Sequence, residues 1–414
     1  MGQSPVSSPD RLPRLLVLNQ YYAPGYEATA QLLAELCEAL AEDHDVTVLT
    51  GRLSADEPQG RREVRNGVAV VRVPSTAYDR SRILLRATNY VSYVAQSLRA
   101  GLAAPRPDVV LCMTDPPFVA DVALLVARRF GVPLVVISQD VFPEIATQLG
   151  RLRNPLVVGL LRALVRLYLR RADRIVAIGE TMRSRLEEKG APRERLRVIP
   201  NWVDTTRLSP EPRDNVWARE NRLAGRFVVM HSGNVGHAQD LETLVRAATF
   251  LRDLDDLDVV IVGSGARHAA LLALSERLEA DRVRFLPYQA REVLHLSLAS
   301  ADVHVVGLAA GLAGYVVPSR LYGVLAAARP VIAAVEETTE TARVVAEAGC
   351  GVVVPPGRPE LLAEAIRDAH GGRLDLDQMG MRAREYVVAE ADRGIAVERY
   401  RSLLEEVRSN GRVR

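Results

Sequence analysis

Short apolar runs alternate with longer amphipathic stretches along almost the whole chain, and this alternation constrains the fold more than any other feature. In the first half, six apolar runs are typical of strands: 15–19, 46–50, 68–73, 109–113, 134–138 and 174–178. Helical periodicity lies between most of them, at 27–41, 81–103, 118–129 and 180–189. Nearly continuous apolar strands separated by helices indicate a parallel sheet that is covered on both faces.

The same alternation starts again near residue 226. Expected strands lie at 227–231, 259–262, 283–285, 303–306 and 331–334, and expected helices at 239–251, 266–279, 290–299 and 319–328. The segment 201–225 between the two halves is polar and holds two prolines, which is the composition of a linker. The sequence therefore predicts an α/β protein in which two doubly wound, Rossmann-like domains face a cleft.

The domain limits follow from these patterns. We expect a disordered N-terminus at 1–13, an N-terminal domain at 14–205, a C-terminal domain at 206–385, and a C-terminal helix at 386–414 that packs back on the N-terminal domain. In open α/β sheets, ligands bind at the carboxyl ends of the strands. The loops that follow each strand are therefore the places to look for chemistry.

Composition excludes several classes of protein. The 414 residues include 53 basic and 51 acidic side chains, so a net charge of +2 offers no bulk attraction for nucleic acid. Cys37, Cys112 and Cys350 lie far apart, and the seven histidines form no closely spaced pair. We therefore expect neither a disulfide framework nor a metal site. No apolar run reaches the roughly 18 residues that span a bilayer, and the N-terminus has no secretory signal, which predicts a cytoplasmic protein.

Two glycine-containing loops follow expected strands of the second half. Ser232-Gly233-Asn234-Val235-Gly236 lets the backbone approach a ligand closely, and the Asn234 amide can bond a phosphate or sugar oxygen. Gly263-Ser264-Gly265 precedes a helix whose free N–H groups suit an anion. A tight turn explains this second loop equally well.

The sharpest local feature is Pro318-Ser319-Arg320 at the start of the helix expected at 319–328. Ser319 is a natural N-cap, and free N–H groups, the positive end of the helix dipole and Arg320 converge there. Together they predict a diphosphate site that needs no metal, and the alternative is a capped helix with a solvated arginine. Glu340, at a further helix start, can bind ribose hydroxyls or act as a capping-box acid.

Carboxylates follow an expected strand of the first half. Asp140 and Glu144 come after the buried run 134–138, where a general base or a hydroxyl-positioning group belongs, although a local turn is the alternative. The acidic segments 253–258 and 375–377 resemble metal-binding DxD sequences. The first precedes a strand and the second begins a helix, so we interpret both as solvated charge.

The stretch 151–174 is apolar and rich in arginine. A basic amphipathic helix of this kind can lie on anionic lipid, and the alternative is a packed helix with a charged outer face. The first interpretation predicts peripheral contact with the inner face of the plasma membrane. The seven arginines are Arg151, Arg153, Arg162, Arg166, Arg170, Arg171 and Arg174.

These motifs together resemble the GT-B glycosyltransferases of family 4, over roughly residues 14–409. The motifs are NQYYAPG, QDVFPE at 139–144, IPNWVD at 199–204, HSGNVG at 231–236, IVGSG at 261–265, VPSRLYGVLAAARPVIA at 317–333 and AGCGVVVPPG at 348–357. Their order and spacing are most similar to the subgroup that builds cell-surface polysaccharides, such as N-acetyl-fucosamine transferases.

The resemblance implies a retaining transferase that needs neither metal nor cofactor. The nucleotide-sugar donor, a UDP-sugar, is expected mainly on the C-terminal domain, and a lipid-linked glycan acceptor on the N-terminal one. Asp140 is expected close to the reacting centre and, with Arg320, to act in catalysis. The other expected donor contacts are Gly233, Asn234 and Ser319 at the diphosphate, Gly265 beside them, Tyr288 at the base, and Glu340 near the ribose or sugar.

The chain also departs from the family pattern. Two glutamates common in family 4 fall on Tyr315 and Gly323, and a common arginine and lysine fall on Asn234 and Gln239. Arg320 is then the main cation left for a diphosphate. Two other hypotheses stay open at this point: a non-catalytic protein that binds nucleotide sugars, and a UDP-sugar 2-epimerase.

Overall fold

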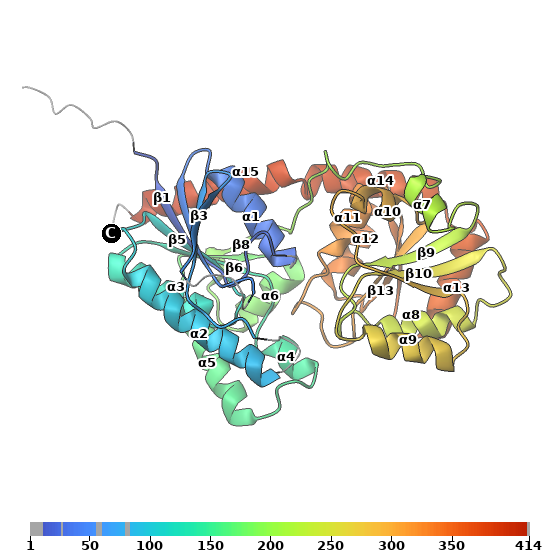
Figure 1. Ribbon diagram of the computed structural model, residues 1–414, viewed down its shortest axis with the longest axis horizontal. Helices are drawn as coiled ribbons and strands as arrows, with labels where there is room; N and C mark the ends of the chain where they lie inside the picture. The colour runs from blue at the N-terminus through green and yellow to red at the C-terminus, as the bar shows by residue number, and fades with distance from the viewer. Residues whose placement is uncertain (1–10, 26–27, 55–59, 79–82, 412–414) are drawn as a thin grey trace, which may run out of the picture.

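The structure, a computed structural model, describes residues 11–25, 28–54, 60–78 and 83–411 and shows two α/β domains side by side (Figure 1). The two doubly wound domains expected from the sequence are confirmed. The disordered N-terminus expected at 1–13 falls almost entirely on residues outside these ranges.

The N-terminal domain is built on an eight-stranded sheet of order β3-β4-β2-β1-β5-β6-β7-β8. All neighbouring strands run parallel except the antiparallel pair β3 and β4. The sequence pattern did not predict β3 or β8, because β3 is largely exposed and polar and β8 has three residues. The strands are β1 (Arg14–Leu18), β2 (Asp45–Thr50), β3 (Arg62–Arg65), β4 (Val68–Arg72), β5 (Val109–Met113), β6 (Leu134–Ser138), β7 (Arg174–Ala177) and β8 (Leu196–Val198).

Helices cover both faces of this sheet. Successive side chains of a strand point to opposite faces, so Leu15 and Val17 enter one core while Leu16 and Leu18 enter the other. The first core is closed by α1 and the last helix of the chain, and the second by α2, α3, α5 and α6. The helices are α1 (Ala28–Leu40), α2 (Ile83–Leu102), α3 (Val119–Phe130), α4 (Glu144–Gln148), α5 (Pro155–Arg171) and α6 (Glu180–Glu188).

The C-terminal domain has a six-stranded parallel sheet of order β11-β10-β9-β12-β13-β14. The order changes direction between β9 and β12, so the loops after these strands flank a topological switch point. The strands are β9 (Phe227–Ser232), β10 (Leu257–Val262), β11 (Val283–Leu286), β12 (Val303–Gly307), β13 (Val331–Ala334) and β14 (Gly351–Val354). The helices are α7 (Val216–Glu220), α8 (Leu241–Thr249), α9 (His268–Arg277), α10 (Leu294–Ala299), α11 (Arg320–Ala326), α12 (Glu340–Ala348) and α13 (Pro359–His370).

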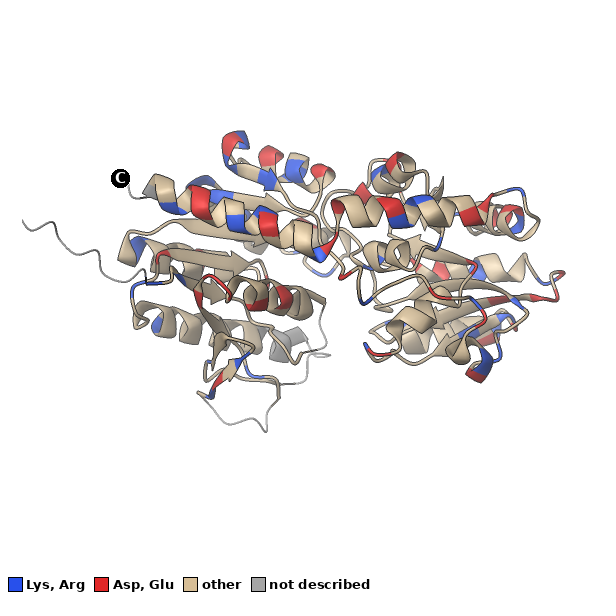
Figure 2. Ribbon diagram, turned by 90° about the horizontal axis from the view of Figure 1, so that it is seen from above, with Lys and Arg blue, Asp and Glu red and all other residues tan. Residues whose placement is uncertain are grey.

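Two consecutive helices end the chain and join the domains. Helix α14 (Leu376–Glu390) packs on α11 and α12, whereas α15 (Arg393–Gly411) packs on the N-terminal domain. Basic and acidic residues alternate along both helices (Figure 2). The chain therefore crosses between domains at Ala391 and Asp392, a few residues beyond the expected limit at 386. At this point Val203 N donates to Ala391 O at 3.0 Å, so both crossings of the chain lie together.

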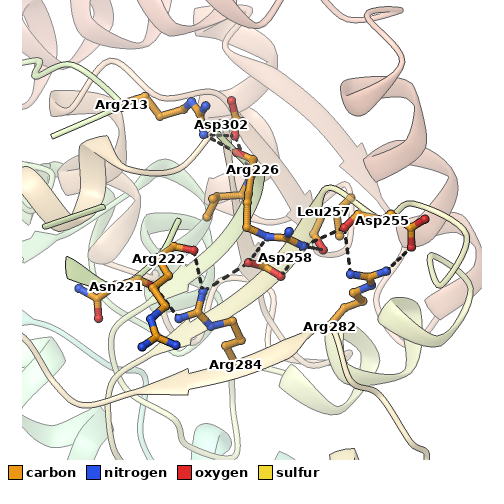
Figure 3. A network of polar contacts seen from close by, with 11 residues as sticks. Arg213, Asn221, Arg222, Arg226, Asp255, Leu257, Asp258, Arg282, Arg284 and Asp302 are labelled. Carbon is orange, nitrogen blue, oxygen red and sulfur yellow. Dashed lines mark hydrogen bonds and ion pairs between the residues drawn. The ribbon is translucent and has the colours of Figure 1, made fainter. Parts of the chain in front are cut away.

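The acidic segment 253–258 is ion-paired rather than simply solvated. Asp258 is only 6% exposed and receives two hydrogen bonds from Arg226, at 2.6 and 3.0 Å, and one from Arg284 at 3.3 Å (Figure 3). Our interpretation was wrong for Asp258. This carboxylate lies on β10, between Arg226 directly before β9 and Arg284 on β11, and both arginines bind it. The second acidic segment begins a helix as expected, since Asp375 accepts from Gln378 N and caps α14.

Within the described ranges, no helix combines the length and the apolar character needed to cross a membrane.

Asp121, in the first turn of α3, is a buried acid of the N-terminal domain. Both of its carboxylate oxygens are buried, and neither has a hydrogen-bond partner among the described residues. Burial raises the pKa of Asp121 to about 7. The folded protein therefore keeps a proton on this side chain that the unfolded chain releases near pH 3.8.

We expect this acid to make the protein less stable as pH rises from about 4 to about 7, because the unfolded chain binds fewer protons over that window. Asp121→Asn removes the titration, so the variant should match wild type near pH 4 and exceed it at pH 8 by on the order of 1–3 kcal/mol. Thermal unfolding between pH 4 and 8 measures this difference. Asp255→Asn, which alters an exposed carboxylate, is the control, and identical profiles for wild type and Asp121→Asn would contradict the expectation.

Candidate active site

Two glycine loops of the C-terminal domain pack backbone against backbone beside the switch point. Gly233, Gly263 and Gly265 have φ angles of +137°, +141° and +156°, which favour glycine. A Cβ on Gly263 would lie 1.9 Å from Gly233 O, and one on Gly265 would lie 2.4 Å from Val235 O. The glycines are therefore needed to bring these two loops together, whatever else the loops bind.

Arg320 lies next to the first glycine loop. It is the first residue of α11, and a Cβ on Gly233 would lie 3.8 Å from Arg320 Cδ. Arg320 Nη1 is 3.1 Å from Nε2 and 3.3 Å from Nδ1 of His231. His231 is fully buried near the end of β9, so the guanidinium is held where β9 meets its loop.

The electrostatics of this pair favour an anion. Burial lowers the pKa of Arg320 to about 10, which leaves the guanidinium charged at neutral pH. Burial and then the charge of Arg320 hold the pKa of His231 well below its ordinary value, so the imidazole is neutral. Among the residues that the structure describes, no carboxylate forms an ion pair with Arg320, and burial is the sole cause of its pKa shift. A half-buried cation without a carboxylate partner at the start of α11 is a suitable partner for a phosphate oxygen.

Ser319 occupies the N-cap position of α11 but does not cap it. Its backbone is already helical, with φ −60° and ψ −25°, and its side chain makes no capping hydrogen bond. The expectation of a serine cap was wrong, because a capping side chain reaches its target from an extended backbone. The first turn of α11 is instead satisfied by backbone, because Leu321 N donates to Pro318 O at 3.2 Å and Tyr322 N donates to Ser319 O at 3.3 Å.

The remaining expected donor contacts follow neighbouring strands. Asn234 is exposed in the first glycine loop, and Gln239 Oε1 accepts from Gly236 N at 3.0 Å and so braces that loop. Tyr288 is 51% exposed after β11. Gly263 N donates to Leu286 O at 3.0 Å, which places the loop of Tyr288 beside the second glycine loop.

Asp140 comes from the other domain and meets the segment that leads into α11. Asp140 and Val316 form an antiparallel bridge, and Val141 N donates to Tyr315 O at 2.8 Å. Asp140 is exposed on the cleft side, but the surrounding protein desolvates its carboxyl group and raises its pKa to about 6.

The second acid of this segment is in a different environment. Glu144 pairs with Arg162 at 3.1 Å and with Lys189, the single lysine of the chain. Burial acts to raise the pKa of Glu144, but Lys189 and Arg162 hold it below its ordinary value. Asp140 is therefore the acid of this loop that is free to meet a substrate.

Glu340 lies on the cleft side of the C-terminal domain, but its carboxylate is already occupied. It is 2% exposed, accepts from Thr181 N at 3.0 Å and forms an ion pair with Arg343 at 2.6 Å. It is the first residue of α12, whereas Thr339 is the cap of that helix. Glu340 thus does not act as a capping-box acid for its own helix.

The two positions that lack the family glutamates have structural roles. Tyr315 packs against the core of the N-terminal domain, with the Arg185 guanidinium 5.1 Å from its ring centroid. A Cβ on Gly323 would point at Leu298 and Leu208, 3.6 and 4.0 Å away. In the part of the chain that is described, no cluster of three or more His, Cys, Asp or Glu side chains could hold a metal ion.

Sequence reasoning missed two residues near the site. His231 is the second-last residue of β9, directly before the glycine loop. A polar residue at this place could have been recognised from the sequence as a site residue. Glu336 Oε2 accepts from Gly311 N at 3.0 Å and so ties the loop after β13 to the loop after β12. Nothing in the local sequence predicts this second contact, because the partners are 25 residues apart.

The chain matches two family models, and each covers one of the two domains. A glycosyl transferase 4-like domain matches residues 27–202, and the glycosyl transferases group 1 model matches residues 214–386. The chain is a group 1 glycosyltransferase of family 4. Its GT-B architecture and its dependence on a nucleotide-sugar donor follow from this membership.

Individual relatives agree with this assignment. The enzyme is 28% identical over 319 residues to WbjE of Pseudomonas aeruginosa, named as a glycosyltransferase, with 77% of this chain and 79% of WbjE covered. It is 28% identical over 398 residues to WcaI of Escherichia coli K12, named as a colanic acid biosynthesis glycosyl transferase, with 92% and 97% covered. Its fold is similar to that of HepE from Anabaena in complex with UDP and glucose, with a TM-score of 0.73, 16% identity, and 96% and 100% covered.

We expect the transfer rate to fall as pH is lowered through about 6, because protonation removes the charge of Asp140. Asp140→Asn should be slower by about a hundredfold or more and should lose this inflection. The measurement is the rate of nucleoside diphosphate release between pH 5 and 8. Glu144→Gln is the control, and it should keep the inflection. An unchanged inflection in Asp140→Asn would remove this residue from the reacting centre.

Proposed function

We propose that the enzyme is a retaining, metal-independent transferase that moves a sugar from a UDP-sugar to a lipid-linked glycan in cell-surface polysaccharide synthesis. The observation that supports the donor site is Arg320, a half-buried cation beside Gly233 that has no carboxylate partner among the described residues. The name of WcaI supports a role in polysaccharide synthesis, and the UDP complex of HepE supports UDP as the nucleotide.

Charge develops on the leaving diphosphate when the bond between the sugar C1 and its phosphate oxygen breaks. The Arg320 guanidinium stabilises that charge. An acceptor hydroxyl attacks C1 from the same face and forms the new C1–O bond, and its proton passes to the departing phosphate oxygen. In this proposal Gly233, Asn234, Ser319 and Gly265 line the diphosphate side.

Asp140 acts from the acceptor side. Its backbone is bridged to Val316, four residues before Arg320 in sequence, so its carboxylate approaches the same region from the opposite domain. In the proposal it accepts a hydrogen bond from the acceptor hydroxyl and orients it toward C1. Tyr288 contacts the nucleotide base from the loop after β11.

The acceptor reaches the cleft from the membrane in this proposal. Helix α5 lies at the edge of the N-terminal domain (Figure 1), and Leu156 and Leu160 on it are 83% and 61% exposed. The expected arginines surround these residues: Arg151, Arg153, Arg162, Arg166, Arg170 and Arg171 are all exposed. An apolar stripe with flanking arginines suits an anionic lipid surface at the inner face of the plasma membrane.

Removing the Arg320 charge should weaken nucleotide binding. For Arg320→Ala we expect a loss of about 1.5–3 kcal/mol in UDP affinity, because a hydrogen bond to a charged group is lost. Titration calorimetry with UDP, GDP, ADP and dTDP, each with EDTA or with Mg²⁺, measures this and identifies the nucleotide. Arg358→Ala, at an exposed arginine of the same domain, should bind as wild type does.

Two outcomes of that titration, and two of activity measurements, would contradict the proposal. Unchanged affinity in Arg320→Ala would remove the diphosphate role, and binding only with Mg²⁺ would contradict metal independence. Tight binding with no transfer to any acceptor would favour the non-catalytic alternative, and epimer formation without acceptor would favour the epimerase.

Charge removal on α5 should weaken membrane binding. For Arg166→Gln/Arg171→Gln we expect a loss of about 2 kcal/mol, or roughly thirtyfold in the partition coefficient, at about 1 kcal/mol per arginine. Co-sedimentation with phosphatidylglycerol vesicles measures this, and phosphatidylcholine vesicles give the background. Arg382→Gln/Arg408→Gln, on the two C-terminal helices, is the control. Equal binding to both kinds of vesicle would refute the membrane contact.

A further inference from the structure

The two domains touch along a strip that the glycosyl-transfer chemistry does not explain. Helix α6 of the N-terminal domain meets α12 and the loop after β12 of the C-terminal domain. Arg185 Nε donates to Ala313 O at 3.2 Å, and the Arg185 guanidinium lies over the Tyr315 ring. Specific contacts therefore hold the two domains together along this strip.

Glu340 makes the most specialised contact of this strip. Its Oε2 accepts from Thr181 N, in the first turn of α6, at 3.0 Å. The first N–H groups of a helix have no partner within the helix, and a carboxylate there is favoured by the helix dipole. The residue at the N-cap of α6 is Gly179, which has no side chain to serve as a cap. A carboxylate from one domain thus caps a helix of the other.

Gly179 is what allows this approach. A Cβ built on Gly179 would lie 2.5 Å from Cδ of Glu340, so any other residue would displace either Glu340 or α6. The φ angle of Gly179 is −179°, an extended conformation that every residue adopts. The glycine is therefore required by the contact between the domains and not by its own backbone conformation.

Arg343 holds Glu340 ready for this contact. Its Nε and Nη2 donate to Glu340 Oε1 at 2.9 and 2.6 Å, one turn along α12. One carboxylate oxygen is thus bound within the C-terminal domain, and the other is directed at α6. Opening the cleft would expose Glu340, which is 2% exposed here, and would leave Thr181 N without its partner.

We propose that Glu340 is a positioning residue that holds the cleft closed through the start of α6, rather than a ligand of the donor sugar. The closed arrangement places Asp140 beside the segment that leads to Arg320, so the Glu340 contact acts on the reaction through these residues. The inference rests on the proposed function only for its kinetic measurement, because the distance between the domains is observable without any substrate.

The test measures the distance between the domains in solution. Spin labels at Leu125→Cys on α3 and Leu272→Cys on α9 report it, since these side chains are 50% and 41% exposed. Cys37, Cys112 and Cys350 are buried and are poor labelling sites. Pulsed electron resonance then gives the distance distribution for labelled wild type and for labelled Gly179→Ala, Glu340→Ala and Glu340→Gln.

We expect Gly179→Ala and Glu340→Ala each to populate longer distances, with the closed fraction reduced about fivefold or more, as for the loss of a helix cap. Glu340→Gln keeps an oxygen for Thr181 N and should recover part of the closed fraction. The double variant Gly179→Ala/Glu340→Ala should be no more open than Glu340→Ala, because the clash needs both side chains. Additive opening, or unchanged distances in all variants, would overturn the proposal.

Kinetics separates this role from a donor contact. Glu340→Ala should keep the UDP dissociation constant within about threefold of wild type while kcat falls about tenfold, since closure assembles the site after the donor binds. A UDP affinity at least tenfold weaker with unchanged distances would make Glu340 a donor ligand and refute the inference. If wild type transfers no sugar, the proposed function fails, but the distance measurement still decides the role of Glu340.

Discussion

The contact between the half-buried guanidinium of Arg320 and the buried His231 ring is the interaction on which the rest of the site depends. A charge removed from water is costly unless a partner compensates it, yet no described carboxylate pairs with Arg320. Its close neighbour His231 is kept neutral by burial and by that same charge. The positive charge is thus left for a ligand, and Gly233 leaves the space beside it open. The folding of β9 and α11 places a positive charge without a carboxylate partner at this point. The negative charge of an anionic donor would compensate it.

A second constraint is that the site is shared between domains. Val203 and Ala391 hold the two chain crossings together, and Glu35 on α1 accepts from Trp202 in the linker at 3.1 Å while also pairing with Arg291 of the C-terminal domain. Contacts near the crossings and contacts across the cleft therefore lie on different parts of one interface.

The residues that stand at the positions of the two family glutamates make packing contacts of their own. Tyr315 contributes an aromatic ring to the core of the opposite domain, and Gly323 packs against leucine side chains inside its own. Gln239 braces the glycine loop, and in the proposed mechanism Arg320 is the cation that meets the diphosphate.

The amino-acid pattern alone predicted the two mainly parallel sheets, since apolar strands buried on both faces leave a clear pattern. It also located the glycine loops and Asp140 after strands and Arg320 at the start of a helix. Tertiary structure alone decided features that depend on distant partners. The edge strands β3 and β8 are too polar or too short to be recognised without the neighbours that pair with them. The edge strand β14 (GVVV) was missed although it is as long and as apolar as predicted strands. Ser319 is no cap because of its backbone angles. Glu340 is engaged by Thr181, 159 residues away, since only folding brings α6 and α12 together.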